Sequence, residues 1–117
     1  MTPEAFVAAL KQVVRDGAER EADYLAALET PRPTEHLARF SEWFRRLSPA
    51  DQEVAREHIQ YATEGSLFGL LTYMDNLAFL TEERGTFELW HVSEAGERVR
   101  LNDPNGDLLS DLFNNLA

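Results

Sequence analysis

The segment from Gly65 to Leu80 is apolar on nearly every face when it is arranged as a helix. A helix without a polar face predicts a position in the middle of a fold, where other elements surround it. Its apolar stretch is about 14 residues long and a bilayer span needs about 20, so we expect no membrane partner. The segment carries Asp75 and Asn76 near its end. We expect this helix to be the most buried element of the protein.

Helical spacing also dominates the N-terminal third of the chain. Thr2 is a typical N-cap, and Pro3 suits the first position of a helix. Apolar residues then recur every three or four positions, which predicts one long helix to about Glu29, just before two prolines. Gly17 lies inside this pattern, and the sequence leaves open whether it breaks the helix.

Two further helix starts follow the prolines. Thr34 is expected to cap a second helix, and Ser48 followed by Pro49 repeats the start signal for a third. Whether the third helix breaks at Gly65 or continues into the apolar segment is also left open. The apolar face of the second helix consists of Leu37, Phe40, Trp43, Phe44 and Leu47.

The pattern changes from helical to alternating after Gly85. Residues 86–92 and 98–101 alternate apolar and polar side chains around a turn that contains glycine, which predicts a β-hairpin. A dense turn signal at 102–106 precedes Asp107, the expected cap of a short final helix. We therefore predict a single domain over residues 1–117 of the mostly α (α+β) class. It would be a helical bundle of about three long helices with a C-terminal β-hairpin and a short final helix.

Composition excludes several classes of function. The chain has 117 residues and 44% hydrophobic residues, but no cysteine, which excludes thiol catalysis, thiolate metal sites and disulfides. Lys and Arg number 11 and Asp and Glu 21, a net charge of −10, so we expect no binding to nucleic acid. Ten arginines against one lysine suggest a GC-rich bacterial genome, and without a signal-peptide pattern we expect a cytoplasmic protein.

Motifs for metals and cofactors are weak. Residues 103–107 resemble a calcium loop, but the glycine falls at the fourth position and the twelfth is Asn114, so a turn is the better interpretation. Glu88 and His91 have the spacing of a helical metal site but lie in a predicted strand, where they would point to opposite faces. No phosphate-binding glycine loop is present. We expect no cofactor and no metal.

Four residues are the candidates for a binding site: Asp75, Asn76, His58 and Glu64. Asp75 and Asn76 stand out because burying a lone carboxylate is costly. In one interpretation the helix ends there, and both residues face solvent or cap a turn. In the other, Asp75 lies at the rim of a pocket or partner surface, held by Arg84 or Arg98.

The runs 61–76 and 107–113, with a hairpin between them, resemble small uncharacterised bacterial proteins, some of immunity type. The resemblance covers about half the chain and depends on the hydrophobic pattern and one aspartate. Similar proteins tend to have glycine after this aspartate, where this chain has Asn76. The resemblance implies a protein that neutralises a secreted toxin, and it brings no catalytic residues.

The leading functional hypothesis is a non-enzymatic acidic interaction protein that binds a basic protein partner. The alternative is a small-molecule or metal-dependent enzyme with a site near residues 65–80, for which Asp75, His58 and Glu64 are the first residues to test. We also expect a homodimer, formed either through the open edge of the hairpin or through the aromatic face of the second helix.

Overall fold

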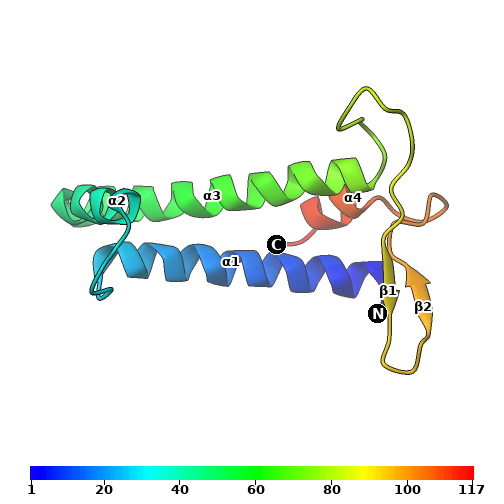
Figure 1. Ribbon diagram of the computed structural model, residues 1–117, viewed down its shortest axis with the longest axis horizontal. Coiled ribbons are helices and arrows are strands. Elements are labelled where there is room, and N and C mark those ends of the chain that lie inside the picture. The colour runs from blue at the N-terminus through cyan, green and yellow to red at the C-terminus, as the bar shows by residue number, and fades with distance from the viewer. The chain divides into compact units, whose positions relative to one another are not determined.

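The computed structural model describes residues 1–117 and contains four helices and one two-stranded sheet (Figure 1). This arrangement confirms the mostly helical α+β class. None of the helices is both long and apolar enough to cross a membrane. In chain order the elements are α1 (Pro3–Ala26), α2 (Glu35–Arg46), α3 (Pro49–Met74), β1 (Trp90–Val92), β2 (Arg98–Arg100) and α4 (Leu109–Asn114).

Three of the predicted N-caps are confirmed. The hydroxyl of Thr2 accepts from the Ala5 N–H at 3.1 Å, and that of Thr34 accepts from the Leu37 N–H at 3.2 Å. The Ser48 hydroxyl accepts from the Asp51 N–H at 3.1 Å. Each bond satisfies one of the backbone donors that the first turn of a helix leaves without an intrahelical partner.

Neither glycine in question breaks its helix. α1 passes through Gly17 and ends at Ala26, three residues before the predicted end at Glu29. α3 passes through Gly65, so the predicted third helix and the first part of the apolar segment are one helix of 26 residues. The helix ends at Met74, and the prediction that it continues to Leu80 is wrong.

The expectation that segment 65–80 is the most buried element is also wrong. Leu71 is only 2% exposed, but its neighbour Leu70 is 53% exposed. Beyond the end of α3 the chain is irregular, and Leu77, Phe79 and Leu80 are each more than half exposed. The segment is apolar on all its faces, which predicted burial on all of them. In the structure only the side of the helix that carries Leu67, Leu71 and Met74 packs on the core, while Leu70 is exposed.

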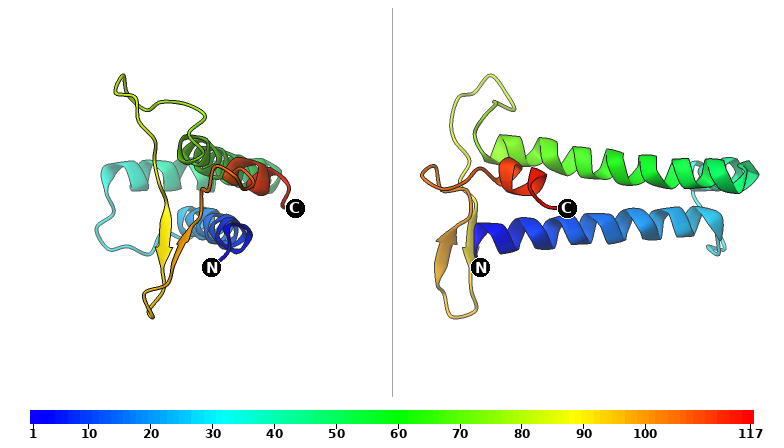
Figure 2. Two further views of the ribbon diagram at one scale, coloured as in Figure 1. Left: turned by 90° about the vertical axis from the view of Figure 1, so that its right-hand side faces the viewer. Right: turned by 180° about the vertical axis from the view of Figure 1, so that it is seen from behind.

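The chain forms two compact units. Unit 1 comprises residues 1–12 and 65–117, and unit 2 comprises residues 13–64. In unit 1, α4 lies between the first turns of α1 and the last turns of α3 (Figures 1 and 2). Its buried core consists of Val7, Leu71, Leu109 and Phe113.

Unit 2 contains α2 with the adjoining parts of α1 and α3. Phe44 of α2 is fully buried, and the hydroxyl of Ser41 donates to the carbonyl of Leu25 at 2.7 Å. Arg56 of α3 lies 5.6 Å from the centre of the Phe44 ring and forms an ion pair with Asp23 of α1 at 2.7 Å. These contacts join all three helices.

The predicted hairpin is confirmed, with shorter strands. β1 and β2 are antiparallel, with Trp90 opposite Arg100 and Val92 opposite Arg98. The turn places Gly96 at φ 85°, a left-handed conformation that glycine adopts without steric cost. The first strand was predicted to begin at Thr86, but β1 begins only at Trp90.

Candidate functional site

The four candidate residues lie in different units. Asp75 and Asn76 follow the last turn of α3 in unit 1, whereas His58 and Glu64 lie on α3 in unit 2. The side chain of His58 is exposed. Glu64 accepts from the Nε atom of Arg15 at 2.6 Å, so its carboxylate is engaged in an ion pair with α1.

Asp75 caps the N-terminus of α4. Its Oδ1 accepts from the Leu109 N–H at 2.7 Å, and its Oδ2 accepts from the Ser110 N–H at 2.9 Å and from the Ser110 hydroxyl at 2.6 Å. A carboxylate at this position also meets the positive end of the helix dipole. The interpretation in which the helix ends before Asp75 is confirmed, but Asp75 caps the distant helix α4 and not a turn. Its partners are α4 donors, not Arg84 or Arg98.

Asp107 does not have the capping role that the sequence predicted. The N-cap position of α4 is Leu108, whose side chain makes no capping bond. Asp75, 34 residues before Leu109, supplies the acceptors in its place. The predicted local cap by Asp107 is therefore absent, and Asp75 at the end of α3 caps α4 from a distant part of the sequence.

Lys11 binds the other end of α4. Its ammonium donates to the carbonyls of Phe113 and Leu116, both at 3.0 Å, and lies 4.3 Å from the centre of the Phe113 ring. The residue is 7% exposed. Sequence reasoning missed Lys11, although its position four residues after Val7, on the buried stripe of α1, was a signal that could have identified it.

We expect Asp75→Asn to weaken the attachment of α4 to the end of α3. The asparagine amide has no negative charge and only one acceptor oxygen, whereas the Asp75 carboxylate accepts from three donors. The loss should be about 1–2 kcal/mol, the usual range for a cap with a helix-dipole contribution. Thermal unfolding measures it, and the amide protons of Leu109 and Ser110 should exchange faster with solvent. Asp107→Asn is the matched control and should change stability by less than about 0.5 kcal/mol. Equal effects of the two substitutions would contradict this role.

Asn76 ends α3 and binds the following extended segment. Its φ of 60° is left-handed, and the Leu77 N–H donates to the carbonyl of Thr72 at 3.2 Å, the bond pattern of a Schellman motif. The Asn76 side chain accepts from the Phe87 N–H at 2.7 Å and donates to the Phe87 carbonyl at 3.1 Å. It pairs with Phe87 as a neighbouring strand would.

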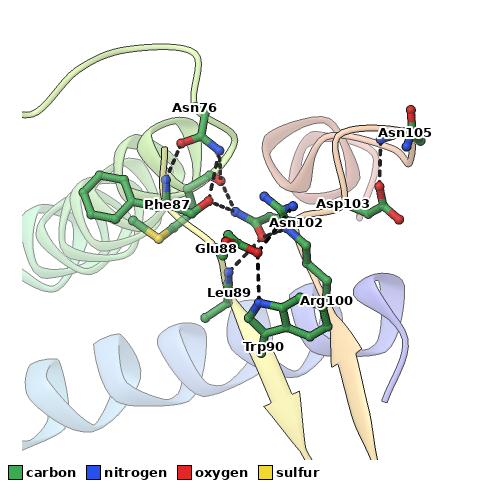
Figure 3. A network of polar contacts seen from close by, with 10 residues as sticks. Asn76, Phe87, Glu88, Leu89, Trp90, Arg100, Asn102, Asp103 and Asn105 are labelled. Atoms are coloured by element: carbon green, nitrogen blue, oxygen red, sulfur yellow. Dashed lines mark hydrogen bonds and ion pairs between the residues drawn. The ribbon is translucent and has the colours of Figure 1, made fainter. Parts of the chain in front are cut away.

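Asn102 lies at the centre of this polar network (Figure 3). Its amide donates to the carbonyls of Met74 at 2.6 Å and Phe87 at 2.9 Å, and its oxygen accepts from the Leu89 N–H at 2.8 Å. The residue is only 6% exposed. The two asparagine side chains therefore bond the backbone of Phe87 and the N–H of Leu89, whereas the Leu89 carbonyl accepts from the Leu101 backbone N–H at 2.7 Å. Side-chain amides thus supply the polar partners just ahead of β1.

The comparisons add no relative. No protein-family model, curated protein or solved structure matches this chain. Within the structure, no group of three or more His, Asp or Glu side chains could hold a metal ion.

Unit 1 carries cavities on both sides of Asn76 and Thr86, two of which are large enough to consider as sites. One, of about 260 Å³, lies beside the 102–108 turn and is lined by Asp75, Asn76, Thr86, Arg100, Asn102, Asp103, Pro104, Asp107 and Leu108. The other, which we call the loop pocket, has a volume of about 320 Å³. The loop pocket is lined by Asn76, Ala78, Phe79, Leu80, Thr81, Glu83, Gly85, Thr86 and Phe87.

The loop pocket is the stronger candidate site. In the first cavity, Asp75 and Asn102 already bond neighbouring backbone groups through their side chains. In the loop pocket, Phe79, Leu80 and Phe87 are 55%, 53% and 44% exposed, so large apolar groups face solvent around a hollow. Exposed apolar groups that gather in this way mark binding surfaces more often than groups that are scattered singly.

Unit 1 is also strongly acidic. It holds ten Asp and Glu against four Lys and Arg, a net charge of −6. Lys11 is buried, and Arg100 lies 3.6 Å from Glu88. Arg84 and Arg98 stack on the rings of Phe79 and Trp90 at 5.4 and 5.1 Å. The basic groups of unit 1 are therefore engaged within it, while the carboxylates of Glu82 and Glu83 remain on its surface.

Proposed function

We propose that this chain is a non-enzymatic interaction protein that binds a basic protein partner through the loop pocket of unit 1. The observation that carries the proposal is the loop pocket itself, in which exposed Phe79, Leu80 and Phe87 lie beside Glu83. An apolar hollow near carboxylates suits a partner segment that presents an apolar side chain flanked by lysine or arginine. Neutralisation of a toxin, as in immunity-type proteins, is one activity that such binding would perform.

The size of the loop pocket supports this kind of partner. At about 320 Å³ it lies near the lower limit for ligand sites in proteins, and it could accept one large side chain as an anchor. A few buried anchor residues, most often tryptophan, tyrosine or arginine, contribute most of the affinity of many protein interfaces. The net charge of −6 on unit 1 would increase the rate of encounter with a basic partner.

Three short synthetic peptides of equal length test the proposal. One alternates arginine with leucine, the second alternates arginine with serine, and the third alternates glutamate with leucine. We expect saturable binding of the first alone, seen as amide chemical-shift changes at residues 77–88, because only that peptide offers both apolar anchors and positive charge. Its affinity should fall as salt is raised from about 50 to 300 mM, since salt screens exposed charges.

A variant pair locates the binding. Phe79→Ser should weaken the arginine–leucine peptide about tenfold or more, as loss of an anchor does. Val13→Ser, at a residue 62% exposed in unit 2, is the control and should leave the affinity unchanged. Absence of binding by every peptide, or equal binding of the glutamate–leucine peptide, would refute the proposed partner.

A further inference from the structure

The walls of the loop pocket belong to a loop that has few polar contacts of its own. Residues 78–86 form no hydrogen bond or ion pair with one another or with the rest of the protein. One ring contact crosses the loop, where Arg84 stacks on Phe79 at 5.4 Å. Such a contact between exposed groups is weak. The shape of the loop, and therefore of the pocket, depends on how the two ends of the loop are held.

The side chain of Asn76 joins these two ends. It lies just past the end of α3, and its amide accepts from the Phe87 N–H at 2.7 Å and donates to the Phe87 carbonyl at 3.1 Å (Figure 3). Asn102 donates to the same carbonyl at 2.9 Å, but the Phe87 N–H has no acceptor other than Asn76. Asn76 and Phe87 both line the loop pocket. Asn76 therefore holds the start of the loop against its end.

The backbone of Asn76 has a separate role. Its φ of 60° ends α3, and glycine and asparagine are the residues that adopt this left-handed conformation most readily. Glycine at this position would keep the end of the helix and lose both amide bonds to Phe87. Alanine would lose the same two bonds and would also strain the backbone, because its Cβ disfavours a positive φ. The two substitutions therefore separate the action of the side chain on the loop from the end of the helix.

We infer that the Asn76 amide is a clamp that preorganises the loop pocket, a positioning role that rests on the function proposed above. An amide that offers one donor and one acceptor to the same residue imitates the two hydrogen bonds of paired strand residues. With the clamp in place, a partner's side chain meets walls that are already ordered, so binding loses less conformational entropy. Without the clamp, only the fraction of molecules whose pocket is formed can bind, and the apparent affinity falls by that fraction.

Backbone amide relaxation of the full chain tests the clamp in Asn76→Gly and Asn76→Ala. The order parameters of residues 78–86 should fall in both variants, and the Phe87 amide proton should exchange about fivefold faster or more. The thermal midpoint should fall about 3–6 °C further in Asn76→Ala than in Asn76→Gly, because only alanine strains the backbone. Asn105→Gly is the matched control and should leave the loop unchanged, since the exposed Asn105 side chain forms no hydrogen bond.

Binding of the arginine–leucine peptide is the second measurement. Its dissociation constant should rise about fivefold or more in Asn76→Gly and stay unchanged in Asn105→Gly. A loop as ordered in Asn76→Gly as in the wild type would overturn the inference, even if Asn76→Ala loosened it, because Asn76 would then act only through the end of the helix. A loosened loop that binds the peptide with wild-type affinity would also overturn it. If no peptide binds the wild type, the proposed function fails, whereas the relaxation data still decide whether the clamp orders the loop.

Discussion

Replacing Leu71 with aspartate is expected to unfold unit 1. The Leu71 side chain is 2% exposed and packs in the core with Val7, Leu109 and Phe113. None of these neighbours can pair with a carboxylate, so the charge would be buried without compensation. The loss should be about 4 kcal/mol or more, a large fraction of the stability of a small domain. Urea unfolding followed by circular dichroism measures it.

Leu70→Asp is the control for this experiment. It makes the same chemical change one residue earlier on α3, at a position 53% exposed. Its cost should stay within about 1 kcal/mol, because an exposed carboxylate keeps its hydration. If the two variants unfolded at the same urea concentration, the assignment of Leu71 to the core and of Leu70 to the surface would be wrong.

Removing the amide of Asn102 is expected to have the second largest effect. Asn102→Ala would take the side-chain partner from the carbonyls of Met74 and Phe87 and from the N–H of Leu89. A partly buried polar group that loses its only partner costs about 1–3 kcal/mol. The Phe87 carbonyl keeps the Asn76 amide at 3.1 Å, so we expect a total loss of about 2–4 kcal/mol, most of it from the Leu89 N–H. We expect a lower thermal midpoint and faster hydrogen exchange at Leu89, where the amide proton would face no acceptor.

Asn105→Ala serves as the comparison for Asn102→Ala. Asn105 is exposed in the neighbouring turn, and its hydrogen bond to Asp103 comes from the backbone N–H, which alanine retains. Its effect should be below about 0.5 kcal/mol. A thermal midpoint of Asn102→Ala equal to that of Asn105→Ala would show that the network in Figure 3 contributes nothing to stability.

Much of the candidate site could not be predicted from the sequence. Asp75 and Asn76 were identified as unusual because they are polar residues in an apolar segment, and the structure shows both as ends and caps of helices. Lys11 carried only the signal of its position four residues after Val7, and Asn102 gave no signal, since a single asparagine is ordinary in any sequence. The loop pocket was missed as well, because residues 76–80 were assigned to a buried helix, and Thr86 and Phe87 to a strand.

The sequence by itself determined the features that depend on neighbouring residues. Thr2, Thr34 and Ser48 cap their helices because a side-chain oxygen can bond a backbone N–H three residues ahead without help from the rest of the protein. Alternation across 98–101 and a turn at Gly96 likewise were enough to predict the hairpin.

Only the tertiary structure decided which long-range partners replace local ones. α4 has six residues, too few to be stable alone, and it is held by Asp75 and Lys11 rather than by its own flanks. Long-range partners also act where α3 ends and just ahead of β1. Asn76 and Asn102 bond the backbone across gaps of 11 to 28 residues, and such pairings arise only once the chain has folded.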